Sequence, residues 1–316
     1  MLSMLAVCLP FFALVGLGYV AGRQQWLPVA ALPGLNALVM LLTLPALLLQ
    51  MGRTWAGQGF AGVGLVPAYA LASLGVVAVA FVLARRAGLM GVERSFAALV
   101  TAFPNTGFMG LPLLGGLLGA GAAAPVVATI VFDLVVTTTL CLVKGGGTAR
   151  QGLALAVRNP LPWAVALGLA MGAAGTVLPA PLEQVLGLLA QACTAVALVT
   201  LGLVLAAQAA HAHRQAVGVD RAATDRVGLQ LALVKLLLHP ALAWGAALLA
   251  QAQGWLDARG CALVVLAAAL PSAANVALLA QRMGADNPAV PRTVMLSTAA
   301  ALLTVPLWAW LLGVRV

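Results

Sequence analysis

The stretches Phe103-Pro104-Asn105-Thr106-Gly107 and Leu270-Pro271-Ser272-Ala273-Ala274-Asn275 each place a proline inside a long apolar segment, where a membrane helix should run on. Every backbone N–H and C=O in a bilayer needs a partner, so a helix that opens at mid-depth is tolerated only where it is buried in protein or lines an aqueous cavity. One break in each half of the chain is typical of a secondary transporter with a substrate site at the membrane midplane.

The composition predicts a membrane protein. Hydrophobic residues make up 63% of the 316 residues and charged residues only 7%, which leaves too little polar surface to cover a soluble globule. The basic residues stand singly or in pairs at the ends of apolar runs, which is a topology signal and argues against nucleic-acid binding. The four cysteines lack the spacing of a metal site, so we expect no bound metal.

Ten apolar segments of about the length that a bilayer core requires, roughly 20 residues, follow one another along the chain. We place them near residues 3–22, 33–51, 60–84, 92–118, 122–143, 159–178, 183–207, 227–249, 259–283 and 289–313. The predicted fold class is an all-α polytopic membrane protein. Because the breaks fall in spans 4 and 9, the simplest architecture is two inverted five-helix repeats with broken, crossing helices.

Positive charge gives the expected orientation. The side that holds the loops after odd-numbered spans carries twelve basic residues, among them Arg282, and the opposite side carries three. By the positive-inside rule the basic side is cytoplasmic, so we expect both termini outside the inner membrane of a bacterium. The longest polar stretch, residues 208–226, is predicted to be one of these cytoplasmic loops.

The run FPNTGFMGLPL (103–113) resembles the broken fourth helix of the auxin efflux carrier family, whose bacterial members include malonate-transporter-like proteins. Stretches near residues 35–48, 159–161 and 235–240 resemble other helices of that family. The resemblance implies a fold similar to that of the bile acid sodium symporters, with two interleaved domains. The implied division is 1–58 (scaffold, spans 1 and 2), 59–150 (transport, spans 3 to 5), 151–212 (scaffold, spans 6 and 7) and 213–316 (transport, spans 8 to 10).

A helix break exposes free N–H groups at the start of the next half-helix, which carries a partial positive charge of roughly half a unit and favours an anion. The residues expected around the substrate are Pro104, Asn105, Thr106, Gly107, Pro271, Ser272, Asn275 and, on span 2, Thr43. The resemblance implies that Asn105 and Asn275 contact the substrate carboxylate. The alternative is a pair of ordinary proline kinks whose polar side chains repair lost backbone hydrogen bonds.

Two ionisable residues other than histidine fall well inside predicted spans: Asp133 in span 5 and Lys235 in span 8. Each costs about 2.5–3.5 kcal/mol to insert, so a partner or a function is expected. We hypothesise a pair or shared polar network, with His239, behind the crossing, through which protonation of Asp133 couples transport to a proton gradient. The alternative is that each side chain reaches water near a helix end.

Sodium is the other candidate coupling ion, because related folds use it near the crossing. The small polar groups of Thr101, Thr106 and Ser272 are candidate oxygen ligands. The residues do not choose between H⁺ and Na⁺, and no cofactor is expected.

These features predict a secondary active transporter of a small organic anion, a mono- or dicarboxylate similar to malonate. It would work by alternating access as a proton-coupled, sodium-coupled or uniport carrier. Neither a nucleotide-binding loop nor a zincin motif nor a second buried acid is present in the sequence, which argues against an enzyme. The alternatives are a sodium-coupled carrier of larger anions, a channel, or a receptor for a carboxylate. The expected partners are the anion and the lipid bilayer. Whether the chain forms a homodimer is left open by the sequence.

Overall fold

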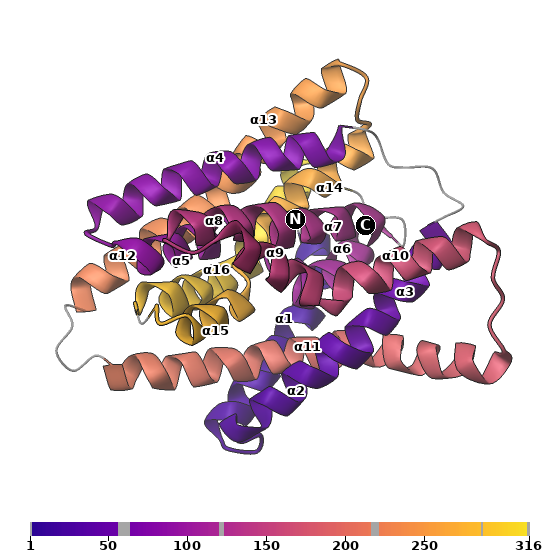
Figure 1. Cartoon of the computed structure of the whole chain (residues 1–316), viewed down its shortest axis with the longest axis horizontal. Helices are drawn as coiled ribbons and strands as arrows, with labels where there is room; N and C mark the ends of the chain where they lie inside the picture. The colour runs from indigo at the N-terminus through magenta and orange to yellow at the C-terminus, as the bar shows by residue number, and fades with distance from the viewer. Residues whose placement is uncertain (1, 56–63, 120–122, 216–220, 286, 315–316) are drawn as a thin grey trace.

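The computed structural model describes residues 2–55, 64–119, 123–215, 221–285 and 287–314. Within these ranges every element is a helix, apart from one isolated antiparallel bridge (Figure 1). A helix satisfies its own backbone donors and acceptors, as an apolar surrounding requires. The predicted all-helical fold class is therefore confirmed for the described residues.

The five predicted spans of the first half coincide with helices. Residues 60–63 of span 3, residue 122 of span 5 and the predicted domain boundary at residue 58 lie outside the described residues. The fourth span is broken at residues 103–105, as predicted. The helices are α1 (Leu2–Arg23), η1 (Val29–Ala31), α2 (Leu32–Leu38), η2 (Val39–Thr43), α3 (Leu44–Trp55), α4 (Leu65–Arg86), α5 (Gly91–Ala102), η3 (Thr106–Gly110), α6 (Leu111–Leu118), α7 (Ala123–Phe132), η5 (Asp133–Thr137) and α8 (Thr138–Lys144).

The five predicted spans of the second half also coincide with helices, and the ninth is broken at residues 270–273. The helices are α9 (Ala149–Arg158), α10 (Pro160–Ala173), α11 (Ala180–Gln215), α12 (Arg221–Leu233), η6 (Val234–Leu238), α13 (His239–Ala252), α14 (Ala258–Ala269), α15 (Ala274–Arg282) and α16 (Ala289–Leu311). The short elements η2, η3, η5 and η6 are π-helical turns within longer helices, a feature that is frequent at functional sites.

The prediction of a loop over residues 208–226 is wrong for most of that stretch. Helix α11 continues through Gln215 and α12 begins at Arg221, while residues 216–220 lie outside the described residues. Alanine is the strongest helix former, and this polar stretch is rich in it, so the helix outlasts the apolar segment.

Seven helical runs are long and apolar enough to cross a membrane among the described residues, or eight if α9 and α10, which meet at a bend of 54°, count as one span. The parts of the broken segments are shorter: α5 and α14 have 12 residues each, below the roughly 20 that a bilayer core requires. The structure therefore supports a multi-pass membrane protein. The count of ten and the inverted repeat stay predictions.

Two pairs of helices approach closely through glycine. Helix α1 packs on α11, where a Cβ added to Gly18 would collide with the carbonyl of Val199, and one added to Gly202 with the carbonyl of Val15. Helix α3 packs on α10 in the same way, through Gly52 and Gly168. In lipid no hydrophobic force drives helices together, and small residues allow their backbones to pack closely.

The remaining long helices pack around the two breaks. Helix α4 lies against α5 and α13, α13 lies against α14, and α16 contacts α12 and α14. Figure 1 shows α4 and α13 side by side, on the opposite side of the molecule from the long α11. The breaks are thus enclosed by protein, which is where open helix backbone is tolerated.

Candidate functional site

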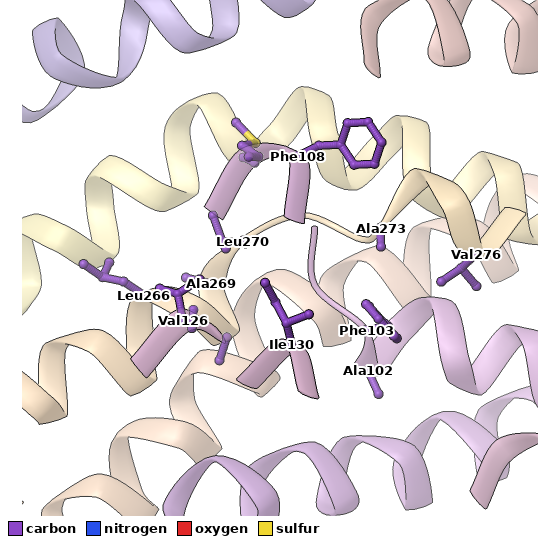
Figure 2. Close-up of a cluster of buried hydrophobic side chains, with 14 of the residues drawn as sticks. Ala102, Phe103, Phe108, Val126, Ile130, Leu266, Ala269, Leu270, Ala273 and Val276 are labelled. Carbon is purple, nitrogen blue, oxygen red and sulfur yellow. The ribbon is translucent and has the colours of Figure 1, made fainter. Parts of the chain in front are cut away.

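The two broken helices meet at their breaks. The N–H of Asn105 donates to the carbonyl of Pro271 (2.7 Å) and the N–H of Ala273 donates to the carbonyl of Phe103 (3.0 Å), which forms the bridge between Pro104 and Ser272. Figure 2 shows the two thin non-helical segments passing between the helix ends, with Phe103 and Ala273 next to them. Each break therefore satisfies backbone groups that the other leaves open.

The prolines account for the breaks. Proline lacks an N–H and disfavours helical geometry in the residue before it. Phe103 and Leu270 accordingly have extended backbone, with ψ of 105° and 150°. A helix continues through an ordinary proline kink, whereas here α5 ends at Ala102 and α14 at Ala269, and the two main chains are hydrogen-bonded to each other.

Two polar side chains at the crossing are buried without a hydrogen-bond partner among the described residues. They are the amide nitrogen of Asn105, whose residue is 2% exposed, and the hydroxyl of Ser272, which is fully buried. An unpaired buried polar group costs about 1–3 kcal/mol, so each one requires an explanation, of which a bound ligand, ion or water is one. The N–H of Ser272 itself is held, because it donates to the hydroxyl of Ser297 on α16 at 3.1 Å.

A small pocket of about 20 Å³ lies beside the crossing, with room for about one water molecule. It is lined by Pro104, Asn105, Thr106 and Gly107 from the first break and by Ala273 and Asn275 from the second. A larger cavity of about 490 Å³ adjoins it. The two share six lining residues: Met40, Phe103, Phe108, Leu134, Asn159 and Asn275.

Asparagine is concentrated at these two cavities. The chain contains five asparagines, and Asn36, Asn105, Asn159 and Asn275 line one cavity or both. Asn36 and Asn159 are site residues that the sequence reasoning did not assign. The signal that points to them is the scarcity of asparagine in an otherwise apolar chain.

The other predicted substrate residues lie close by without lining either cavity. Pro271 contributes its carbonyl to the crossing, and Ser272 is buried behind it. Thr43 is buried in η2, but it is its neighbour Leu44 that lines the small pocket.

Asp133 and Lys235 belong to buried polar clusters next to the crossing. The carboxylate of Asp133 accepts hydrogen bonds from the hydroxyls of Tyr69 (2.6 Å) and Thr137 (2.9 Å). The ammonium of Lys235 donates to the carbonyl of Ala268 (2.9 Å), near the end of α14 that leads into the second break. Both charged residues are 0% exposed, which excludes the alternative that they reach water at a helix end.

His239 links Lys235 to helix α4. Its Nδ1 lies 2.8 Å from the Lys235 ammonium and its Nε2 lies 3.1 Å from the Ser73 hydroxyl, so an imidazole protonated at Nε2 accepts from Lys235 and donates to Ser73. Asp133 and Lys235 form no direct ion pair in the described part of the chain. Both are linked to α4, Asp133 by its hydrogen bond with Tyr69 and Lys235 through His239 and Ser73, and these two α4 residues are one helical turn apart.

The three proposed sodium ligands differ in their hydrogen bonds, and their role stays a prediction, because a hydroxyl that donates a hydrogen bond keeps lone pairs for a cation. The hydroxyl of Thr101 donates to the carbonyl of Ala97 in its own helix (2.7 Å), and that of Thr106 lies 3.5 Å from the carbonyl of Pro104. Of the three, Ser272 alone keeps a hydroxyl without a partner in the described residues.

Comparisons with known proteins identify transporters among the proteins similar to this chain. The membrane transport protein family matches residues 3–150 and 147–309. The chain is 27% identical over 322 residues to the "Putative malonate transporter" of Rhizobium meliloti, with 96% of this chain and 94% of that protein covered. It is 26% identical over 317 residues to the "Uncharacterized transporter YfdV" of Escherichia coli K12, and 28% identical over 316 residues to an "Uncharacterized transporter" of Methanothermobacter thermautotrophicus. In both cases 95% of each chain is covered.

Proposed function

This chain belongs to the membrane transport protein family, to which the auxin efflux carriers belong, and from that premise we propose that it is a secondary active transporter of a small organic anion. The proposed substrate is a mono- or dicarboxylate similar to malonate. One similar protein is named for malonate transport, and amide-rich cavities suit a carboxylate.

The observation that carries the proposal is the set of amides at the crossing. Asn105 and Asn275 line the same pocket from the two breaks, and the amide nitrogen of Asn105 is buried without a partner in the part of the chain that the structure describes. Amide N–H groups and the starts of the half-helices attract a carboxylate by hydrogen bonds and partial charges. Neither break contains lysine or arginine, so the anion is released more easily than from a full ion pair.

Alternating access would move one group of helices against the other. The packing of α1 on α11 and of α3 on α10 supports a scaffold made of spans 1, 2, 6 and 7. If spans 1 to 5 and 6 to 10 are inverted repeats, span 1 corresponds to span 6 and span 2 to span 7. The pair α1 and α11 then corresponds to the pair α10 and α3, and each pair meets at two glycines. The helices around the breaks would then form the mobile transport domain.

The buried clusters suggest how a proton could be coupled to the anion. With Asp133 ionised and Lys235 protonated, Tyr69 and His239 neutral, the clusters carry no net charge. Protonation of Asp133 leaves the positive charge of Lys235 uncompensated near the second break, which favours an anion at the crossing. Proton and anion would therefore be bound together.

The larger cavity suggests which side the site faces. Pro33, Leu155 and Arg282 are exposed residues of its lining and belong to the side of the molecule expected in the cytoplasm from its positive charge. We propose an inward-open carrier in the inner membrane of a bacterium, with both termini outside.

The test is counterflow of labelled malonate in proteoliposomes that contain the purified protein. We expect saturable exchange, which a channel or a receptor does not give. Asn105→Ser removes an amide from the crossing and should abolish exchange. Asn287→Ser is the matched control, because Asn287 lies outside both cavities and caps α16 through the N–H of Ala289, a role that serine also fills. Absence of exchange for every carboxylate tested would contradict the proposal.

A further inference from the structure

One face of α15 forms a wall of the larger cavity. Asn275, Leu278, Leu279 and Arg282 all line it, and their spacing of three, four and seven residues places them on one side of the helix. The wall begins at the crossing, where Asn275 also lines the small pocket, and ends about 10 Å along the helix axis at Arg282. The cavity therefore has polar groups at both ends and leucines between.

Arg282 is exposed and has no acidic partner in the described part of the chain. The Cα–Cβ bond of a helical residue tilts toward the N-terminus of its helix, which for α15 is the end that carries Asn275. Asn36, which is partly buried on α2, lines the same cavity. A cation and an amide from two different elements thus contribute to one chamber.

We propose that Arg282 and Asn36 form a second anchor, which holds the distal carboxylate of a dicarboxylate while the amides of the crossing hold the first. This inference rests on the proposed function and deepens it. A guanidinium binds a carboxylate through two parallel hydrogen bonds, a geometry that the point charge of lysine does not match. A monocarboxylate uses the crossing alone, so the second anchor selects dicarboxylates.

The experiment measures binding of malonate, succinate and propionate to the purified protein by titration calorimetry. Arg282→Gln should weaken both dicarboxylates about tenfold, as expected for one partly solvated charge-assisted contact, and change propionate by less than about twofold. Arg282→Lys should fall between wild type and Arg282→Gln for the dicarboxylates. Arg86→Gln makes the same change at an exposed position outside the cavity, at the end of α4, and should alter none of the three.

Two results would overturn the second anchor. The first is an equal loss of binding affinity for the dicarboxylates and for propionate in Arg282→Gln, which would show that Arg282 attracts anions in general. The second is an unchanged dicarboxylate affinity in Arg282→Gln, and an accompanying loss of a bound anionic lipid in native mass spectrometry would assign the guanidinium to a lipid phosphate. A wild-type protein that binds none of the three compounds contradicts the proposed function instead, so the two failures are distinguishable.

Discussion

The polar groups on the two sides of the crossing differ in whether they have hydrogen-bond partners. Behind the second break, the charged groups of Asp133 and Lys235 and both ring nitrogens of His239 have hydrogen-bond partners. On the cavity side, the amide nitrogen of Asn105 is also buried and has no partner among the described residues. A satisfied cluster holds a structure in place, whereas a buried unsatisfied group requires an explanation, and a bound anion is the one that we propose for Asn105. The predictions below test this contrast.

The largest effect is expected from Lys235→Met. The change removes the positive charge that compensates Asp133 in the buried region and leaves the carbonyl of Ala268 without its donor. An unsatisfied buried group costs about 1–3 kcal/mol, and more where a charge is involved. Denaturant unfolding in detergent measures this cost. The double variant with Asp133→Asn should recover part of it, and a single variant as stable as wild type would show that the cluster does not support the fold.

Asn105→Ser should separate function from stability. Because the amide nitrogen has no partner in the described residues, its removal should change the free energy of unfolding by less than about 1 kcal/mol. Malonate binding should weaken about 10- to 100-fold, as expected for a lost hydrogen bond to a charged group. A loss of stability as large as that in Lys235→Met would remove the distinction between the two sides.

The coupling proposal predicts the sign of a pH effect. If protonation of Asp133 favours the anion, malonate uptake by wild type rises as the pH falls, and Asp133→Asn, which is neutral at every pH, keeps a high and flat uptake. Initial rates in proteoliposomes at several internal and external pH values measure this. A variant whose pH profile matches wild type would exclude Asp133 as the coupling group.

The smallest effect is expected from Ser73→Ala. The change removes the partner of His239 Nε2 and should lower the free energy of unfolding by about 1 kcal/mol. Ser3→Ala, at an exposed position of α1, is the matched control and should have no measurable effect. An equal effect in both variants would show that the hydrogen bond to Ser73 adds nothing.

Local signals predicted the helices and the breaks, because proline chemistry and apolar length act over a few residues. The partners of those elements depend on tertiary packing, which a single sequence does not display. Tyr69, one of two tyrosines in the chain, and Ser73 were missed for that reason, although a hydroxyl pair one turn apart on an apolar helix is a usable signal. The loop over residues 208–226 was predicted from polarity, and the helix propensity of alanine prevailed.

The exchange of main-chain hydrogen bonds between Phe103, Asn105, Pro271 and Ala273 has a consequence for biogenesis. The first break is synthesised long before the second, so its donors and acceptors stay unmatched until residues 270–273 follow. We therefore expect the nascent carrier to be vulnerable to quality-control proteases during that interval, because the C-terminal half supplies the hydrogen-bond partners of the N-terminal one.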